Sequence, residues 1–519
     1  MPTWLDNAIF YEIYPQSFYD TNGDGIGDIA GIIQKLDYIQ DLGCNVLWIH
    51  PCFDSPFRDA GYDIRDYKKV APRYGTNDNL KRLFNEAHSR NLRVILDLVP
   101  GHTSEEHPWF QKSKESSPNE YSNRYIWTDR WFKKPENFGY ISGEADRDGA
   151  YIVNFFKCQP ALNYGFLNVT EPWQLPMDHP DCIATKEALK DIIRFWLDSG
   201  CDGYRVDMAF SLVKNDDDHK TGTSSIWKEI RAMLDADYPE AALISEWGNP
   251  ALAIPAGFHA DFLLPFKSKG WMSLLRDDNC FFNRNGYGDI THFLDEYLPL
   301  YEKTKREGGY IALVTGNHDI ERYRMNLSPE ELALAWAFIF TMPGIPFLYY
   351  GDEIGMRYLN LPNKEGGYTR TGSRTPMQWS SGKNLGFSTA AAEQLYLPVD
   401  SEPDAPTVEA LEKDLASLLN TVKTLLRLRK ENSELQSMPN LEIVFAEKGK
   451  LPVVLKREKF LIAVNPSAKA AEIVIEAGPT EKVFAIGGCD LKGKATGSAC
   501  GHTCRIDAQS FGIWKQISW

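Results

Sequence analysis

The chain has 519 residues, enough for two to four domains, and 43% of them are hydrophobic, which supplies a large core. Its 71 acidic residues outnumber the 56 lysines and arginines and give a net charge of −15, which argues against nucleic acid or an anionic membrane as a partner. There is no run of about 18 apolar residues and no N-terminal basic segment followed by an apolar one, so we expect neither a membrane span nor a signal peptide. The nine cysteines have no regular spacing, which favours free thiols in a cytoplasmic protein.

The first predicted strand, 9–14, is followed by an acidic loop rich in glycine, 20–28. The glycines alone are also typical of a phosphate-binding loop, but three acids would repel phosphate. Oxygen ligands at alternate positions suit a hard cation such as Ca²⁺, and a solvated acidic turn is the alternative. The expected Ca²⁺ ligands are Asp20, Asn22, Asp24, the carbonyl of Ile26, and Asp28.

Further along, a predicted helix over 29–42 leads to a second strand, 45–49. In the loop after that strand, Tyr62 can stack on a sugar ring and Asp63 can accept hydrogen bonds from sugar hydroxyls. The alternative is a polar loop with one packed tyrosine. A helix over 79–90 then leads to a third strand that ends at Asp97, with His102 just beyond it.

The stretch 102–181 breaks this rhythm, because it is rich in aromatic residues and has no long amphipathic run. It is too long for an ordinary loop and predicts a subdomain inserted over one face. From 182 the alternation of strands and helices resumes, and we count eight strands in all. This order predicts an α/β fold, a (β/α)8 TIM barrel over 1–101 and 182–434, with the inserted subdomain after strand 3 and a C-terminal all-β sandwich over 435–519.

Charged side chains stand at the carboxyl ends of four of these strands. Arg205 and Asp207 are two residues apart on one strand and therefore point to the same face, where the cation favours the ionised carboxylate. An isolated Arg-x-Asp is more often a plain salt bridge. Here Asp97, Glu246 and the pair His318-Asp319 end three other strands, and the carboxyl ends of a parallel barrel form the face where chemistry occurs.

With these motifs in place, the chain strongly resembles the α-amylase superfamily of glycoside hydrolases over nearly its whole length. The segments 159–163 and 374–379 are most similar to its oligo-1,6-glucosidase, α-glucosidase and trehalose synthase branch. The matching motifs are Asp97-Leu98-Val99-Pro100-Gly101-His102, Gly203-Tyr204-Arg205-Val206-Asp207, Ser245-Glu246-Trp247 and Gly316-Asn317-His318-Asp319.

The resemblance implies a role for each strand-end residue. Asp207 would be the nucleophile that forms a glycosyl ester, Glu246 the general acid and then base, and Asp319 a transition-state ligand of the sugar. Retention through such an ester needs two carboxyl groups about 5–5.5 Å apart, one charged and one protonated. Further sugar-binding or positioning residues implied by the resemblance are Tyr62, Asp63, His102, Arg205, His318 and Arg374, of which Asp63 and Arg374 would clasp the terminal glucose.

Three functions follow from these motifs. The first is a retaining hydrolase that releases glucose from the non-reducing end of short malto-oligosaccharides, α-1,4 and also α-1,6. The second uses the same intermediate for glucosyl transfer or isomerisation, as in trehalose synthase, and an endo-acting amylase is a further alternative. The third is a binding protein of the kind that shares this fold without activity, which the complete set of acids argues against. We expect a small oligosaccharide as the substrate and a monomer in the cytoplasm.

Overall fold

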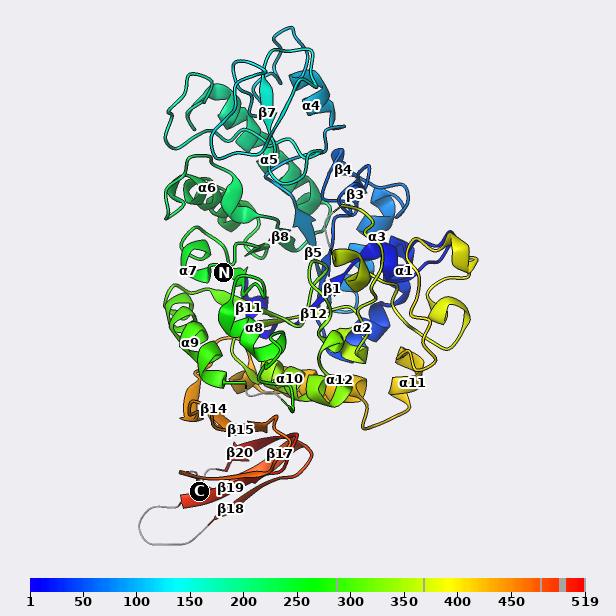
Figure 1. Cartoon of the computed structure of the whole chain (residues 1–519), viewed down its shortest axis with the longest axis vertical. Helices are drawn as coiled ribbons and strands as arrows, with labels where there is room; N and C mark the ends of the chain where they lie inside the picture. Colours follow the sequence, from blue (N-terminus) through cyan, green and yellow to red (C-terminus); the bar gives the residue numbers. More distant parts are fainter. Residues whose placement is uncertain (286–287, 367–368, 477, 494–500, 518–519) are drawn as a thin grey trace.

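The computed structural model describes the chain except for residues 286–287, 367–368, 477, 494–500 and 518–519, and its centre is a closed barrel (Figure 1). Eight parallel strands follow one another in the order β1-β12-β11-β10-β9-β8-β5-β2. This confirms the predicted (β/α)8 barrel. The strands are β1 (Phe10–Ile13), β2 (Val46–Ile49), β5 (Arg93–Leu98), β8 (Gly203–Val206), β9 (Ala242–Ser245), β10 (Ala260–Phe262), β11 (Tyr310–Val314) and β12 (Ile345–Tyr349).

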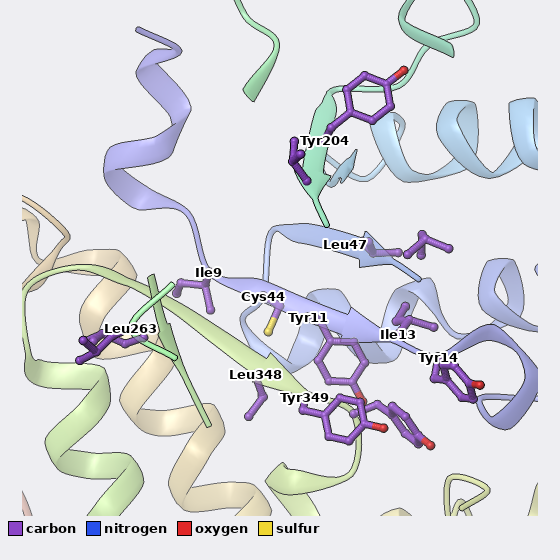
Figure 2. Packing of buried hydrophobic residues seen from close by; sticks show 14 of the residues in the cluster. Ile9, Tyr11, Ile13, Tyr14, Cys44, Leu47, Tyr204, Leu263, Leu348 and Tyr349 are labelled. Carbon is purple, nitrogen blue, oxygen red and sulfur yellow. The ribbon is translucent and has the colours of Figure 1, made fainter. Parts of the chain in front are cut away.

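Side chains alternate between the two sides of each barrel strand, as the two-residue period of a β-strand requires. In β1, Phe10 lies inside the barrel and stacks on Phe347 of β12, with ring centroids 4.1 Å apart. Tyr11 and Ile13 belong instead to the large core between the barrel and its helices (Figure 2). The next inward position of β1, two residues after Phe10 toward the carboxyl end of the barrel, is the polar residue Glu12.

The helices cover the outside of the barrel. The predicted helix over 29–42 is divided into two helices at Lys35. The helices are α1 (Ile29–Gln34), α2 (Leu36–Leu42), α3 (Asn77–His88), α5 (Pro180–Asp198), α6 (Thr221–Asp237), α7 (Pro250–Ala253), α8 (Lys269–Leu275), α9 (Ile290–Arg306), α10 (Pro329–Thr341), α11 (Val408–Glu412) and α12 (Leu418–Glu431). In the described part of the chain, no helix combines the length and apolarity that crossing a bilayer requires.

Between β5 and α5 the chain leaves the barrel and forms the predicted insertion, which lies at the top of Figure 1. It contains α4 (Pro108–Ser113) and the hairpin of β6 (Tyr140–Ser142) and β7 (Ala150–Ile152). A further short pair, β3 (Phe53–Asp54) and β4 (Asp66–Val70), brackets the loop after β2. The insertion has a small core of its own around Ile126, Ile152 and Phe166.

At the other end of the molecule lies a C-terminal domain of antiparallel strands (Figure 1). One sheet has the order β13-β14-β15-β20-β17 and the other β16-β19-β18. Apolar side chains from both sheets, including Leu461, Ile506 and Trp514, form one cluster. The strands are β13 (Glu442–Phe445), β14 (Val453–Arg457), β15 (Phe460–Asn465), β16 (Ala471–Glu476), β17 (Thr480–Ile486), β18 (Cys489–Gly493), β19 (Gly501–Ile506) and β20 (Ser510–Gln516). The exact domain boundaries given by the sequence stay a prediction.

Candidate active site

A cavity of about 420 Å³ opens where the carboxyl ends of the barrel strands meet the insertion and the loops after β10 and β12. Nine of its fourteen lining side chains carry charge or hydrogen-bonding groups, and the other five are apolar. The polar side chains are Asp59, Tyr62, His102, Asp207, Glu246, Lys267, Asp319, Thr369 and Arg370. The apolar ones are Phe155, Met208, Phe210, Leu264 and Phe266.

Arg205 links the two carboxylates that the sequence assigns to chemistry. Both Arg205 and Asp207 project from the end of β8 into the barrel, as their spacing predicts, and Nη1 of Arg205 lies 3.2 Å from Oδ1 of Asp207. Nη2 lies 3.0 Å from Oε2 of Glu246, which follows β9. Gly203 permits this approach of β8 to β9, because its φ is +143° and a Cβ there would lie 2.2 Å from the carbonyl oxygen of Ala242.

Asp207 and Glu246 are both largely buried beside the cavity, where charges are screened less than at the surface. Burial and the nearby Glu246 carboxylate raise the pKa of Asp207 well above its ordinary value, although Arg205 opposes the rise. Arg205 acts in the direction that the sequence predicts, toward the ionised form of Asp207, but burial and Glu246 outweigh it. A nucleophile and a general acid together require one ionised and one protonated carboxyl group.

The backbone N–H of Met208 points toward the carboxyl group of Glu246. Met208 follows the nucleophile position directly and has left-handed torsions, φ 41° and ψ 44°, which cost a non-glycine residue about 1 kcal/mol or more. In this conformation its N–H donates to Oε2 of Glu246 at 3.0 Å. Since Arg205 also contacts Oε2, and no donor among the described residues contacts Oε1, Oε1 is free to carry the acid proton.

Asp319 is held ionised by two arginines. Its Oδ1 accepts from Arg370 Nη1 at 2.7 Å and from Arg374 Nη2 at 3.1 Å. Burial acts to raise the pKa of Asp319, but the two guanidinium groups outweigh it and lower the pKa below its ordinary value. A permanently charged carboxylate in the cavity can stabilise positive charge on a sugar ring.

Tyr62 lines the cavity and packs on the buried His318, which does not line it, so the predicted contact of His318 with the sugar is not seen. Their rings stack at 5.4 Å with an angle of 7°, and the Tyr62 hydroxyl lies 3.0 Å from both His318 Nε2 and Asp97 Oδ2. Asp97 also accepts from Arg205 at 2.9 Å, so it positions both the arginine and the tyrosine. Burial raises the pKa of Asp97 to about 6. Tyr62 therefore lies in the cavity, as the sequence predicts.

Below His318 lies a buried cluster of titratable groups. Glu12 Oε1 is 2.8 Å from His50 Nε2 and 3.2 Å from His318 Nδ1. Among the described residues, this is the only group of three or more His, Cys, Asp or Glu residues whose potential ligand atoms all lie within 4.8 Å of one another. Burial lowers the pKa of both histidines, and the contact with Glu12 fixes the orientation of the His318 ring.

His102 lines the cavity as expected and is held from both ring nitrogens. Its Nε2 lies 3.2 Å from the carbonyl oxygen of Tyr62 and its Nδ1 lies 3.2 Å from Asn154 Nδ2. Burial lowers the pKa of His102 to about 3, so the ring is neutral at physiological pH. In the neutral ring, Nε2–H donates to the Tyr62 carbonyl and Nδ1 accepts from Asn154, so both ring nitrogens position the imidazole and neither is left over for a sugar hydroxyl.

The structure corrects the predicted clasp of Asp63 with Arg374. Asp63 is fully buried and accepts from the Ser55 hydroxyl and from the backbone N–H groups of Arg58 and Asp59, each at 3.0 Å. It therefore closes a turn and does not line the cavity. Arg374 is also buried; its Nε donates to the carbonyl of His318 at 2.9 Å, behind Asp319. Both are positioning residues.

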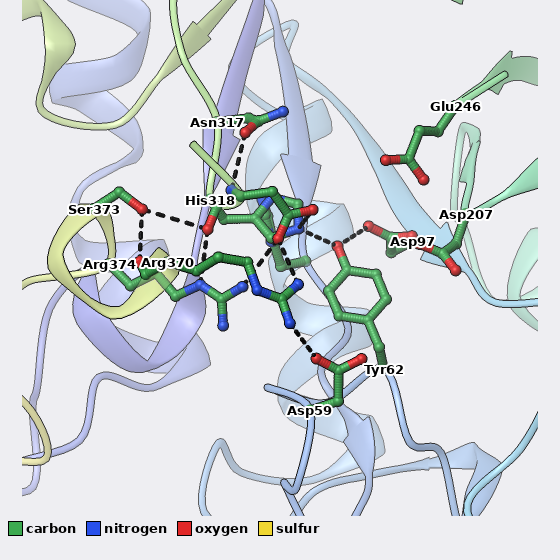
Figure 3. Close-up of polar contacts among 12 residues, drawn as sticks. Asp59, Tyr62, Asp97, Asp207, Glu246, Asn317, His318, Arg370, Ser373 and Arg374 are labelled. Carbon is green, nitrogen blue, oxygen red and sulfur yellow. Dashed lines mark hydrogen bonds and ion pairs between the residues drawn. The ribbon is translucent and has the colours of Figure 1, made fainter. Parts of the chain in front are cut away.

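The ion pair that lines the cavity is formed by Asp59 and Arg370 and not by Asp63 and Arg374. Arg370 Nη2 donates to Asp59 Oδ1 at 3.0 Å while its Nη1 contacts Asp319, and both Asp59 and Arg370 line the cavity (Figure 3). Gln159 of the insertion donates to Asp59 Oδ2 at 2.7 Å and fixes its orientation. The available sequence signals were an acid three residues before Tyr62 and an arginine four residues before Arg374.

The predicted calcium loop has features for and against a cation. Asp20 and Asp28 are buried, and within the described residues no lysine or arginine pairs with them. However, both oxygens of Asp20 accept internal hydrogen bonds, from N–H groups of Asn22, Gly23 and Gly25 and from a serine hydroxyl. The three loop carboxylates also do not converge within 4.8 Å. The Ca²⁺ assignment to Asp20, Asn22, Asp24, Ile26 and Asp28 stays a prediction.

Comparison with known proteins agrees with this site. Residues 12–437 match the model of the α-amylase catalytic domain. The chain belongs to the α-amylase family. It is 34% identical over 482 residues to the trehalose synthase/amylase of Mycobacterium tuberculosis, covering 83% of this chain and 76% of that protein.

Two further relatives of this α-amylase family member match nearly full length. An oligo-1,6-glucosidase of Heyndrickxia coagulans is 30% identical over 539 residues, covering 90% of this chain and 93% of that protein. The crystal structure of an α-glucosyl transfer enzyme superposes with a TM-score of 0.80 at 26% identity, covering all of both chains. Members of the family are glycoside hydrolases or related glycosyl-transferring enzymes, so this protein is an enzyme of that class.

Proposed function

We propose that this enzyme is a retaining α-glucosidase that releases glucose from the non-reducing end of short malto-oligosaccharides, with α-1,4 and also α-1,6 linkages cleaved. The observation that carries the proposal is the chain of contacts from Asp59 through Arg370 to Asp319. It crosses the cavity from the loop after β2 to the loops after β12 and β11. A site closed at one side admits a chain end and excludes the middle of a polymer.

The proposed chemistry has two steps. Asp207 attacks the anomeric carbon, the glycosidic bond breaks, and Glu246 donates its proton from Oε1 to the leaving oxygen. Glu246 then removes a proton from water, which attacks the ester and frees Asp207. Asp319 stabilises the positive charge that develops on the ring, and its two arginines keep it ionised.

Glucosyl transfer or isomerisation is the second candidate. It is favoured by the similarity to a trehalose synthase/amylase, since a sugar and water compete for the same ester. Endo-acting hydrolysis of starch receives no support from the Asp59–Arg370 contact. The linkage, a bound Ca²⁺, the monomeric state and the cytoplasmic location stay predictions.

Chromatography of early products tests the proposal. Maltotriose should give glucose and maltose from the first minutes, maltose and isomaltose should give glucose, and soluble starch should be a poor substrate. Trehalose from maltose in excess of glucose would favour the second candidate. Rapid loss of starch viscosity, with mid-sized oligosaccharides ahead of glucose, would contradict the exo-acting assignment.

A further inference from the structure

A cluster of titratable side chains that the proposed mechanism does not use lies inside the barrel, below the catalytic cavity. It consists of Glu12 on β1, His50 directly after β2 and His318 in the loop after β11. All three are buried, and none of them lines the cavity. His50 Nε2 and His318 Nδ1 lie 2.8 and 3.2 Å from the same carboxylate oxygen, Glu12 Oε1. Three potential metal ligands therefore converge on one point.

The barrel strands hold these side chains in place. β1 and β2 are neighbours in the closed sheet, and Glu12 is in register with Trp48, two residues before His50. The His50 ring stacks on the Trp48 ring with centroids 4.8 Å apart, and it lies nearly perpendicular to the His318 ring at 4.1 Å. Ligands at the ends of strands are positioned more precisely than ligands on long loops.

Glu12 lacks the partner that a buried carboxylate requires. Its Oε2 atom is buried and accepts no hydrogen bond, and no lysine or arginine among the described residues forms an ion pair with Glu12. Arg205 acts to lower the pKa of Glu12, but burial outweighs it, and the guanidinium is already engaged by three other carboxylates. Buried charges in proteins are paired or coordinate metals. A divalent cation beside Oε1 would supply the missing charge, with Oε2 in place to complete its coordination.

The hydrogen bonds above the cluster favour a cation at His318 Nδ1. Burial lowers the pKa of His318, so its ring carries one proton, and its Nε2 lies 3.0 Å from the Tyr62 hydroxyl and 3.3 Å from Asp319 Oδ2. With that proton on Nδ1, Nε2 would face the Asp319 carboxylate as a second acceptor. Nε2 and Asp97 Oδ2 would then compete for the single Tyr62 proton. A metal ion on Nδ1 leaves the ring proton on Nε2, which donates toward Asp319 while Tyr62 donates to Asp97.

Two imidazole nitrogens and one carboxylate are ligands typical of zinc. Ca²⁺ and Mg²⁺ prefer oxygen ligands, whereas two histidines and a glutamate bind Zn²⁺ and leave a fourth position for another oxygen. We propose that Glu12, His50 and His318 form a Zn²⁺ site inside the barrel. The ion joins β1, β2 and the loop after β11, and it holds the His318 ring on which Tyr62 packs. This inference goes beyond the proposed α-glucosidase function and does not depend on it.

Elemental analysis of the full chain, folded in cells, tests the site. Because the ligands are buried, the ion has to enter during folding, so the protein is expressed in medium supplemented with Zn²⁺ and purified without chelator. About one Zn²⁺ per chain is expected. Expression with Co²⁺ instead should give the visible absorption of tetrahedral Co²⁺ with nitrogen and oxygen ligands. Absence of metal from both preparations would overturn the inference and place a proton on Glu12 where the ion is proposed. Sulfur-to-cobalt charge-transfer absorption would also overturn it, since it would show cysteine ligands.

Variants locate the ion. His50→Gln and Glu12→Gln should each lower the metal content to about a tenth of the wild-type value or less, because loss of a ligand weakens a site at least as much as loss of an outer-shell partner. His259→Asn is the matched control, since His259 is a buried barrel histidine outside the cluster. Its Nδ1 accepts from the N–H of Leu243 at 2.9 Å, and asparagine can accept the same bond. Equal metal content in the control and in either folded cluster variant, as judged by circular dichroism, would overturn the inference.

Two further measurements separate this site from the other proposals. Asp24→Asn, in the acidic loop, should keep its Zn²⁺, and loss of Zn²⁺ from that variant alone would place the ion in the loop and overturn the inference. Maltose hydrolysis is measured on the same samples. Metal-free wild-type protein that hydrolyses maltose would leave the α-glucosidase assignment standing and the zinc site wrong. Zn²⁺ that is present in the wild type and lost from His50→Gln would support the zinc site even if maltose were not a substrate.

Discussion

Arg370 donates to Asp59 at 3.0 Å with one nitrogen of its guanidinium group and to Asp319 at 2.7 Å with another. A single side chain therefore closes one side of the cavity and also favours the ionised form of Asp319. The side chains of Arg370 and Asp59 are only 12% and 5% exposed. A planar guanidinium can serve two carboxylates in this way, and a lysine cannot reproduce the geometry. Arg374 adds a second contact to Asp319 from behind.

Replacement of this arginine should therefore affect binding and catalysis together. Arg370→Ala should raise KM for maltose and cost roughly 2–5 kcal/mol in kcat/KM, because it leaves two carboxylates short of a partner in a largely buried site. Steady-state kinetics on maltose and maltotriose measure the effect. Arg58→Ala is the control, since Arg58 is 49% exposed and pairs with surface glutamates. Equal kinetics in the two variants would contradict the role of Arg370.

The roles of the two central carboxylates can be told apart by azide. Asp207→Ala should lose several orders of magnitude in kcat, and azide should restore turnover of an activated aryl α-glucoside with formation of the β-glucosyl azide. Glu246→Ala should form the ester with that substrate, and azide should then give the α-glucosyl azide. NMR of the products identifies the anomer. The same anomer from both variants would refute the assignment of nucleophile and acid.

Positions on strands could be predicted from the sequence better than positions in loops. The two-residue period placed Arg205 and Asp207 on one face, and the contact at 3.2 Å confirms it. The loop after β2 has acids at both Asp59 and Asp63, and the sequence does not indicate which one turns inward. The choice is made by backbone N–H groups that bind Asp63, and by Gln159, one hundred residues away, which binds Asp59.

The five apolar side chains of the cavity could not be predicted as a group for a related reason. The group joins residues from three segments far apart in the chain, and each of them alone reads as an ordinary buried or exposed apolar residue. Phe155 comes from the insertion and Phe266 from the loop after β10. Only the folded barrel brings these loops together around one cavity, so their joint contribution to its lining is visible in the structure alone.

Buried neutral histidines should make the fold sensitive to acid. Burial lowers the pKa of His107 to about 3, whereas an unfolded histidine titrates near 6.5. As the pH falls below about 6.5, His107 binds a proton in the unfolded chain but not in the folded chain. The contribution of neutral His107 to the free energy of unfolding is therefore fully present above pH 6.5 and is lost toward pH 3. The loss approaches about 1.4 kcal/mol per pH unit for one such group.

His107→Asn isolates that contribution. His107 Nδ1 accepts from the N–H of Trp109 at the start of α4, and asparagine is also a good acceptor at that position, so the cap is kept while the titration is removed. Urea unfolding at pH 7, 6 and 5 should show the stability of the variant falling less steeply than that of the wild type. His219→Asn, at an exposed site, should follow the wild type. Parallel curves for all three proteins would mean that His107 is not neutral when folded.

Removal of divalent cations tests the acidic loop. If Ca²⁺ binds at Asp20, Asn22, Asp24, Ile26 and Asp28, excess chelator should lower the melting temperature, because a ligand of the native state stabilises it, and added Ca²⁺ should restore it. KM should change little, since these residues do not line the cavity.

The variant Asp24→Asn should weaken the response to chelator, because it removes one ligand charge without changing the shape of the side chain. Its matched control is Asp146→Asn, which removes one charge from an exposed site in the insertion and should respond like the wild type. Elemental analysis of the purified protein gives an independent measure of bound metal. An unchanged melting curve in chelator, together with no metal in the protein, would assign the loop to its internal hydrogen bonds. Asp20 and Asp28 would then act as acceptors for the backbone N–H groups of the loop and of α1.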